Sequence, residues 1–341
     1  MSSGLHGTRI LVTGATGFLG GAVARSLRAQ GAAVLGQGRN PEATAAMEEA
    51  GLTMQRMALE DRAAVFACFD AFRPDHVVHC AAKSAPFGRA VDFVRANVDG
   101  TRHLLGASRA SGVVRFVHVS SPSIYCAGRP LQEVSEDTPL PKRAINAYAE
   151  TKRAAEQLVL EAHRAGVSCV ILRPRAIYGP GDNALFPRLL MALKDGKLPI
   201  IGDGANRIDL TYVDDAVASV RLALRADERC LGQAYNITSG EAVRLWDLIG
   251  TLADRLGLER PTRRISRRTA HVAAAVLESS HRLLRRPGEP RLTRHSVDSL
   301  SLDATLDISA ARRDLGYEPR VSVEEGVARF LASLERQPAA P

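Results

Sequence analysis

The chain has 341 residues, 45% of them hydrophobic and 24% charged, so it is long enough to bury a full core in one large domain or two. Five widely spaced cysteines with no CxxC pair argue against a disulfide framework or a zinc site and favour a reducing cytoplasm. Residues 260–294 contain ten arginines and two glutamates and account for the whole net charge of +8, so the composition gives no reason to expect nucleic-acid binding.

Short apolar runs alternate with helical patterns along the first 240 residues. Five of these runs are almost continuously apolar, as expected for parallel strands that are covered on both faces: 9–12, 33–35, 76–79, 116–119 and 169–172. Helical patterns fall between them, for example at 22–30 and 147–165. This alternation predicts right-handed βαβ units and an α/β fold of the Rossmann type, a doubly wound parallel sheet.

Three glycines with regular spacing follow the first predicted strand and open the first helix. In the pattern Gly14-x-x-Gly17-x-x-Gly20, Gly14 permits a tight turn, Gly17 lets the backbone approach a pyrophosphate, and Gly20 allows close packing of helix and strand. The free N–H groups of the helix would then face the phosphates. We therefore expect residues 1–174 to form an NAD(P)-binding core. Residues 175–341 would form a smaller, mainly substrate-binding portion, with 206–240 returning to the core sheet.

The end of the second predicted strand bears on which dinucleotide binds. Sites that prefer NAD often place an acid there for the ribose 2′-hydroxyl, but this chain reads Gly36-Gln37-Gly38-Arg39-Asn40. Arg39 could accept a 2′-phosphate in a charge-assisted hydrogen bond, or it could be a solvated loop residue. The pattern favours NADP(H), with NAD(H) as the alternative.

Tyr148 and Lys152 lie four residues apart and share one face of a predicted helix. The lysine ammonium and an oxidised nicotinamide would both favour the phenolate and lower the pKa of the tyrosine. Such a tyrosine can donate or accept a proton at neutral pH while a nicotinamide carries the hydride. The fourth predicted strand ends in a serine-rich stretch at the edge of the sheet where ligands bind, and the spacing alone leaves open which hydroxyl holds the substrate oxygen: Ser120, Ser121 or Ser123.

With these motifs the chain resembles the extended short-chain dehydrogenase/reductase family, which includes epimerases and dehydratases of nucleotide-linked sugars. The resemblance covers nearly the whole chain and rests on TGATGFLG at 13–20, HCAAK at 79–83, NVDGT at 97–101, YAETK at 148–152, LRPRAIYGPG at 172–181, YVDD at 212–215 and YNI at 235–237. Later segments resemble the branch with 3β-hydroxysteroid dehydrogenases, sterol-4-carboxylate decarboxylating dehydrogenases and 2-alkyl-3-oxoalkanoate reductases. These segments are GDG at 202–204, IDLTYV at 208–213, GEPRLTR at 288–294 and LGYEP at 315–319.

The resemblance implies roles for individual residues. The catalytic set would be Ser121, Tyr148, Lys152 and Asn97. Cofactor contacts would come from Gly14, Thr16, Gly17, Phe18, Leu19, Gly20, Arg39, Ala58, Leu59, Ala81, Ala82, Lys83, Val119, Tyr148, Lys152, Pro174, Ala176 and Ile177. Substrate contacts would come from Ser123, Ser84 and Arg175. No metal is expected, and the family often forms homodimers.

The expected activity is interconversion of a secondary alcohol and a ketone on a hydrophobic small molecule, either a 3β-hydroxysteroid or a 3-oxo or 3-hydroxy alkanoate. The alternative is an epimerase, reductase or dehydratase of nucleotide-linked sugars with bound NAD. Those enzymes often carry an arginine for the diphosphate where this chain has Ile208, which argues against that alternative, although Arg207 is adjacent. A non-catalytic dinucleotide-binding regulator is disfavoured because both Tyr148 and Lys152 are present.

The arginine-rich segment contains an amphipathic helical pattern over 270–286. Its apolar stripe has arginines beside it, with Val272, Ala273, Val276, Leu277, Leu283 and Leu284 on the stripe and Arg282, Arg285 and Arg286 next to it. This helix could pack on the body with a solvated basic face, could cover a hydrophobic pocket as a lid, or could attach 260–294 to an anionic membrane surface. No apolar run is long enough to span a membrane.

Overall fold

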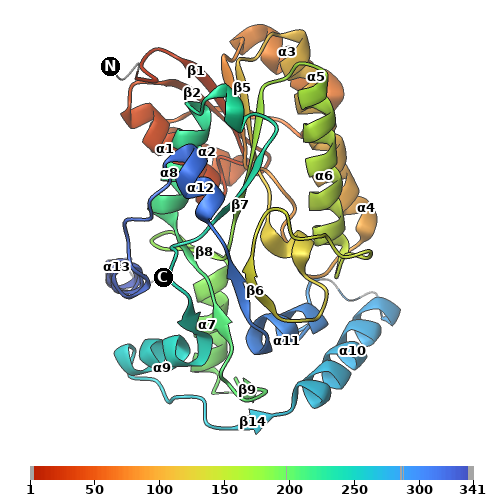
Figure 1. The fold of residues 1–341 in the computed structure, drawn as a ribbon, viewed down its shortest axis with the longest axis vertical. Helices are drawn as coiled ribbons and strands as arrows, with labels where there is room; N and C mark the ends of the chain where they lie inside the picture. Colours follow the sequence, from red (N-terminus) through yellow and green to blue (C-terminus); the bar gives the residue numbers. More distant parts are fainter. Residues whose placement is uncertain (1–3, 197, 285, 287, 337–341) are drawn as a thin grey trace.

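The computed structural model describes residues 4–196, 198–284, 286 and 288–336. A parallel seven-stranded sheet runs through the upper half of the molecule in the order β12-β7-β5-β4-β1-β2-β3 (Figure 1). Its strands are β1 (Arg9–Thr13), β2 (Ala33–Gly38), β3 (Thr53–Arg56), β4 (His76–His79), β5 (Arg115–Val119), β7 (Cys169–Pro174) and β12 (Ala234–Ile237). All five strands expected from the apolar runs are present, and the prediction of a Rossmann-type parallel sheet is confirmed.

Helices cover both faces of this sheet because alternate strand residues point to opposite sides. One face packs against α1 (Phe18–Ala29), α8 (Val213–Leu224) and α12 (Ser309–Leu315), where Ile10 and Val12 join the core. The other face packs against α3 (Arg62–Phe72), α5 (Gly100–Ala110) and α6 (Ala147–Arg164), where Leu11 is buried. This two-sided burial explains why the strands read as unbroken apolar runs. The helix α2 (Pro41–Glu49) follows β2.

A second, smaller layer lies below the carboxyl edge of the main sheet (Figure 1). Its four-stranded sheet has the order β13-β10-β15-β6 and draws strands from distant parts of the chain: β6 (Leu131–Val134), β10 (Arg207–Ile208), β13 (Val243–Arg244) and β15 (Ala304–Leu306). Around it lie α7 (Leu185–Lys194), α9 (Leu245–Arg255), α13 (Val323–Glu335) and the strand pairs β8 (Ile177–Tyr178) with β11 (Thr211–Tyr212) and β9 (Ile200–Ile201) with β14 (Arg264–Ile265). Their side chains form a separate apolar core.

The arginine-rich segment forms α10 (Arg267–Leu283), which packs against α11 (Arg294–Ser301) at the outer end of the smaller layer (Figure 1). Its buried positions are Ala270, Ala274 and Glu278, one turn apart. The apolar stripe expected to pack inward is instead largely exposed: Val272 is 66%, Val276 63% and Leu283 84% exposed. Arg285, expected beside the stripe, lies outside the described residues. Of the three alternatives for this helix, packing on the body through this stripe is not what the structure shows.

Small side chains explain the orientation of α10. Ala270 and Ala274 allow close approach to Val297 of α11, and the three join one small apolar cluster with Ile201. Glu278 is buried because it accepts two hydrogen bonds from Arg294, at 2.8 Å from the backbone N–H and 3.0 Å from Nε. A buried carboxylate needs such partners, and they hold this face of the helix inward. Among the described residues no helix is long and apolar enough to cross a membrane.

Candidate active site

The glycine turn joins β1 to α1 and packs directly on the loop that follows β4. Gly14 has a φ of +69°, and a Cβ at this position would lie 2.8 Å from the backbone of Ala81. A Cβ at Gly20 would collide with the carbonyl oxygen of Gly14. Only glycine fits either position, so the backbone N–H groups at the start of α1, including those of Phe18 and Leu19, are brought close to the turn.

A cavity of about 200 Å³ opens beside this turn. Its lining includes seven of the residues expected to contact a cofactor, namely Gly14, Thr16, Gly17, Arg39, Leu59, Ala81 and Ala82. Gln37 also lines it and braces the turn, since its Oε1 accepts from the N–H of Gly14 at 3.1 Å and its Nε2 donates to the carbonyl of Met57 at 2.7 Å. The sequence reasoning assigned Gln37 no role, although its place at the end of β2 was a signal.

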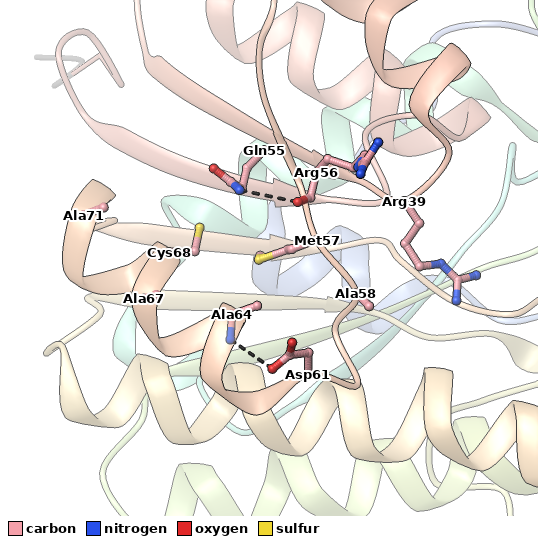
Figure 2. Close-up of a pocket in the computed structure, with 10 residues that line it drawn as sticks. All are labelled: Arg39, Gln55, Arg56, Met57, Ala58, Asp61, Ala64, Ala67, Cys68 and Ala71. Atoms are coloured by element: carbon pink, nitrogen blue, oxygen red, sulfur yellow. Dashed lines mark hydrogen bonds between the residues drawn. The ribbon is translucent and has the colours of Figure 1, made fainter.

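Arg39 stands between this cavity and a larger hollow of about 550 Å³ along β3 and α3, to which Ala58 also contributes (Figure 2). Its guanidinium forms an ion pair with Glu60 at 3.2 Å, and both side chains are partly exposed. No acid occurs at the end of β2, but the loop after β3 places Glu60 beside Arg39, in the lining of the smaller cavity. Asp61 caps α3 by accepting from the N–H of Ala64 at 3.1 Å (Figure 2).

Tyr148 lies in the first turn of α6, which begins after Asn146. The Asn146 side chain caps this helix by accepting from the N–H of Ala149 at 2.9 Å. The pKa of Tyr148 is raised by burial, and hydrogen bonding from Ser121 and then Ser84 offsets part of that increase. The structure therefore brings Ser121, from the end of β5, and Ser84, from the loop after β4, to the same phenol.

Lys152 lies one turn further along α6 and is almost fully buried. Its Nζ donates to the carbonyl oxygen of Val119 at 2.6 Å. Burial lowers its pKa to about 8, against the opposing effect of Glu156. In this structure burial raises the pKa of Tyr148, and the Lys152 ammonium donates to a backbone carbonyl.

A buried ion pair lies behind the lysine. Arg173 donates from Nε and Nη2 to the two carboxylate oxygens of Glu156, at 2.9 and 2.6 Å. Arg173 also donates to the hydroxyl of Tyr125. Because Glu156 is bound in a bidentate manner, it contributes only long-range attraction to Lys152.

Asn97 is buried in the π-helix Val94–Asp99 and connects the loop after β4 to α6. Its Oδ1 accepts from the N–H of Lys83 at 2.7 Å, and its Nδ2 donates to the carbonyl of Lys83 and to Thr151 Oγ1, at 3.2 and 3.0 Å. Asn97 therefore positions both walls of the site without contacting Tyr148.

His79 extends this network to the glycine turn, a role that the sequence reasoning did not assign. The Thr13 hydroxyl accepts from the N–H of Ala81 and lies 2.7 Å from His79 Nδ1, to which it donates when Nε2 carries the proton of the neutral ring. The Thr101 hydroxyl donates to the carbonyl of Asn97, so it accepts from His79 Nε2 at 2.9 Å. These bonds select a single neutral tautomer. Burial lowers the pKa of His79 to about 3, with a smaller contribution from Lys152.

The substrate side of the site contains several polar atoms that have no hydrogen-bond partner among the described residues. They are buried and come from Ser120 Oγ, Ser123 Oγ, Asn146 Nδ2 and Arg175 Nε. Pro174 ends β7, Ile177 begins β8, and Ala176 between them has a φ of +44°, an uncommon conformation for a residue with a Cβ. Ser123 and Arg175, expected as substrate contacts, are therefore on the same carboxyl edge as Ser121.

Comparisons with known proteins show what this chain is similar to. Residues 10–238 match the NAD dependent epimerase/dehydratase family. The chain is 39% identical to the 2-alkyl-3-oxoalkanoate reductase of Stenotrophomonas maltophilia, with 95% of this chain and 99% of that protein covered. It is 36% identical to the 3beta-hydroxysteroid-dehydrogenase/decarboxylase isoform 1 of Arabidopsis thaliana, with 75% of this chain and 61% of that protein covered.

Among solved structures, the UDP-glucuronic acid 4-epimerase of Bacillus cereus in complex with NAD is similar, with 25% identity and a TM-score of 0.75. The alignment covers 96% of this chain and 99% of that one. The family match spans more than half of this chain, and the resemblance inferred from the motifs is confirmed. The chain belongs to the NAD dependent epimerase/dehydratase family of extended short-chain dehydrogenases/reductases.

Proposed function

We propose that this protein is an NADP(H)- or NAD(H)-dependent oxidoreductase that interconverts a secondary alcohol and a ketone on a hydrophobic substrate. The observation that carries the proposal is the meeting of Tyr148, Ser121 and Lys152 at the carboxyl edge of the sheet, beside the glycine turn. The names of the two relatives support a 3-oxo alkanoate or a 3β-hydroxysteroid as the substrate class.

The residues of the glycine turn fit a dinucleotide, because the turn closes on Ala81 at a distance that excludes a side chain and leaves a cavity beside the start of α1. A bound nicotinamide would supply or accept the hydride. In the reductive direction Ser121 would donate a hydrogen bond to the ketone oxygen and Tyr148 would transfer its proton to that oxygen as negative charge develops. Lys152 would stabilise the resulting phenolate by its charge.

NADP(H) is the preferred cofactor in this proposal. Arg39 lines the cavity beside the start of α1 and carries the positive charge that a 2′-phosphate requires. Glu60 shares that guanidinium at 3.2 Å and would repel the phosphate, so the preference over NAD(H) is expected to be modest. Steady-state KM values for NADPH and NADH would measure it directly.

The alternative is an epimerase, reductase or dehydratase of nucleotide-linked sugars, supported by the likeness to the UDP-glucuronic acid 4-epimerase. Ile208 opposes it. This residue is buried in β10 and pairs with Val243 and Ala304, so it offers a diphosphate neither charge nor a hydrogen bond. Arg207 is exposed but donates to the carbonyl of Ala242 at 2.9 Å.

A screen of NADPH and NADH consumption tests the proposal against this alternative. The panel contains 3-ketosteroids, 2-alkyl-3-oxo acids and UDP- and dTDP-sugars. Reduction of a ketone in the first two groups, lost in Tyr148→Phe, is the expected result. Interconversion of a nucleotide-linked sugar without net consumption of reduced cofactor would favour the alternative.

We also propose that α10 makes a peripheral contact with an anionic membrane surface, as a lipid-like substrate would make useful. Its exposed apolar residues lie next to exposed arginines such as Arg268 and Arg282, the combination found in helices that lie in a membrane interface. Co-sedimentation with phosphatidylserine vesicles at low and high salt tests it. The double substitution Val276→Ser with Leu283→Ser should abolish binding; binding that is unchanged by it would exclude this surface.

The proposed assembly is a homodimer, to be measured by light scattering in solution.

A further inference from the structure

Two buried nitrogen atoms of the substrate-binding portion lack hydrogen-bond partners among the described residues, outside the set formed by Tyr148, Ser121 and Lys152. Nε of Arg175 and Nδ1 of His295 are both shielded from solvent and have no hydrogen-bond partner among the described residues. Arg175 directly follows β7, and His295 lies in the first turn of α11, where the charge of Arg175 acts on its ring. A buried donor without an acceptor costs about 1–3 kcal/mol, so the Nε of Arg175 requires an explanation.

The backbone of Arg175 is fixed, which makes its side chain a preorganised donor. Its N–H donates to the carbonyl of Ile237 at 3.0 Å, and its own carbonyl accepts from Thr211 Oγ1 at 2.6 Å. The guanidinium therefore starts from a rigid point at the carboxyl edge of the main sheet, immediately after Pro174 and on the same edge as Ser121.

The charge of this guanidinium is not neutralised by a direct partner. The groups nearest to it in electrostatic effect are the Cys126 thiol and the Asp209 carboxylate, and burial lowers the pKa of Arg175 more than these two groups raise it. Asp209 accepts from the N–H of Leu306 at 2.7 Å, and it forms neither an ion pair nor a hydrogen bond with Arg175 in the described part of the chain.

His295 adds a second donor without adding a full charge. Burial lowers the pKa of His295, and the nearby positive charge of Arg175 lowers it further, while Asp298 opposes both effects. Asp298 Oδ1 receives Arg267 Nη2 at 2.6 Å and His271 Nε2 at 2.8 Å, and no hydrogen bond joins Asp298 to His295 or Arg175 in the described part of the chain. The imidazole is thus neutral at neutral pH and can donate one hydrogen bond.

We propose that Arg175, assisted by His295, binds the carboxylate of a 3-oxo or 3-hydroxy acid substrate. A carboxylate offers the two acceptor oxygens that a guanidinium recognises, and it would satisfy the buried Nε of Arg175, with the nearby imidazole as a further hydrogen-bonding group. The inference rests on the proposed function and makes it more specific, because it selects free acids over esters and over uncharged ketosteroids. The alkyl chain of such an acid would extend toward the apolar residues of the smaller layer.

The test compares an acid with its uncharged ester in the oxidative direction, where both compounds are stable. The kcat/KM values for 3-hydroxydecanoate and methyl 3-hydroxydecanoate with NADP⁺ are measured for the wild type and for Arg175→Gln, Arg175→Lys and His295→Gln. Arg109→Gln, an exposed position on α5, is the matched control.

The wild type should prefer the acid. Arg175→Gln should lower kcat/KM for the acid about 100-fold and for the ester by less than about 3-fold, the range of a charge-assisted hydrogen bond. Arg175→Lys should recover part of this loss, and His295→Gln should cost the acid about 10-fold.

Equal losses for acid and ester in Arg175→Gln, or a wild type with no preference for the acid, would overturn the inference. Failure of the proposed function gives a different result, namely that the wild type oxidises neither compound. In that case binding of decanoate and of methyl decanoate is measured by calorimetry without turnover. Decanoate binding that is lost in Arg175→Gln and kept in Arg109→Gln still supports the carboxylate site, and equal binding in both variants overturns it. Thermal unfolding curves of each variant identify any that fail to fold.

Discussion

The cofactor side of this molecule is formed by consecutive elements of the chain, whereas the substrate side is formed by segments that are distant in sequence. On the cofactor side, β1, the glycine turn and α1 are consecutive in the chain, and each glycine is explained by an atom a few residues away or on the neighbouring strand. On the substrate side, Ser123, Arg175 and His295 come from three distant segments and leave polar atoms unpartnered. The first region is satisfied by its own contacts, whereas the second needs a ligand to satisfy it.

This contrast has a consequence for tolerance to change. Substitutions on the cofactor side should damage packing and dinucleotide affinity together, because the turn has no free space. Substitutions of the unpartnered polar atoms on the substrate side should leave the fold intact and change activity or selectivity, because those atoms make no hydrogen bonds within the described part of the protein.

The largest expected effect is that of Tyr148→Phe, which lies where the two sides meet. Removal of the hydroxyl takes away the proton donor, so kcat should fall about 10³-fold, within the range of general acid catalysis. Cofactor affinity, measured by quenching of protein fluorescence or by calorimetry, should stay within about 2-fold because the phenol is not needed for the turn. The matched control is Tyr235→Phe, since the Tyr235 hydroxyl is buried without a partner and should be dispensable. Full activity of Tyr148→Phe would refute the proposed chemistry.

The next effect is that of Gly14→Ala on the cofactor side. Its φ of +69° is unfavourable for alanine, and the added Cβ would meet the backbone of Ala81 at 2.8 Å. We expect the Kd for NADPH to rise about 100-fold and the protein to lose about 1–3 kcal/mol of stability, measured by calorimetry and by urea unfolding. Gly106→Ala is the control, because a Cβ there meets Phe66 at an ordinary 3.6 Å. A Gly14→Ala variant with normal affinity would contradict the close packing of the turn.

The buried histidines of the central strands give a third prediction, which concerns acid stability. Burial lowers the pKa of His118 well below its usual value, and both of its ring nitrogens lack partners among the described residues. The unfolded chain therefore binds a proton near pH 6.5 that the folded chain does not, so stability is lost as the pH falls below about 6.5. The loss is about 1.4 kcal/mol per pH unit for each such group.

Replacing this ring should reduce that sensitivity. His118→Phe is expected to match the wild type within about 1 kcal/mol at pH 7 and to unfold less readily at pH 5, as measured by urea unfolding at both values. The exposed His6→Gln serves as the control and should leave the difference between the two pH values unchanged. An unchanged acid loss in His118→Phe would mean that the folded protein accommodates the charged ring.

Local features of the chain were sufficient to predict the main sheet and the glycine turn, whereas the choice of Ser121 among three serines came from the family resemblance. An apolar run such as 169–172 indicates a buried strand, because both faces of the strand are covered. The spacing of YxxxK places its tyrosine and lysine on one face of a helix. The orientation of α10 could not be predicted this way. Its larger apolar residues suggested one buried face, but close packing against α11 selected the alanines, and the partner of Glu278 lies 16 residues further along the chain.

The pairing of Arg39 with Glu60 could not be predicted from the sequence either, because it joins two loops 21 residues apart. Substitution of this pair gives the smallest of the expected effects. If Glu60 holds the guanidinium away from a 2′-phosphate, Glu60→Gln should raise the ratio of kcat/KM for NADPH to that for NADH by about 3-fold, the modest range of exposed charge pairs. Arg39→Gln should lower the same ratio by about 10-fold, since it removes the only cation among the residues that line the cavity beside the start of α1. A ratio that rises in Arg39→Gln would mean that Arg39 takes no part in cofactor choice. An unchanged ratio in Glu60→Gln would mean that the acid acts only as a surface partner.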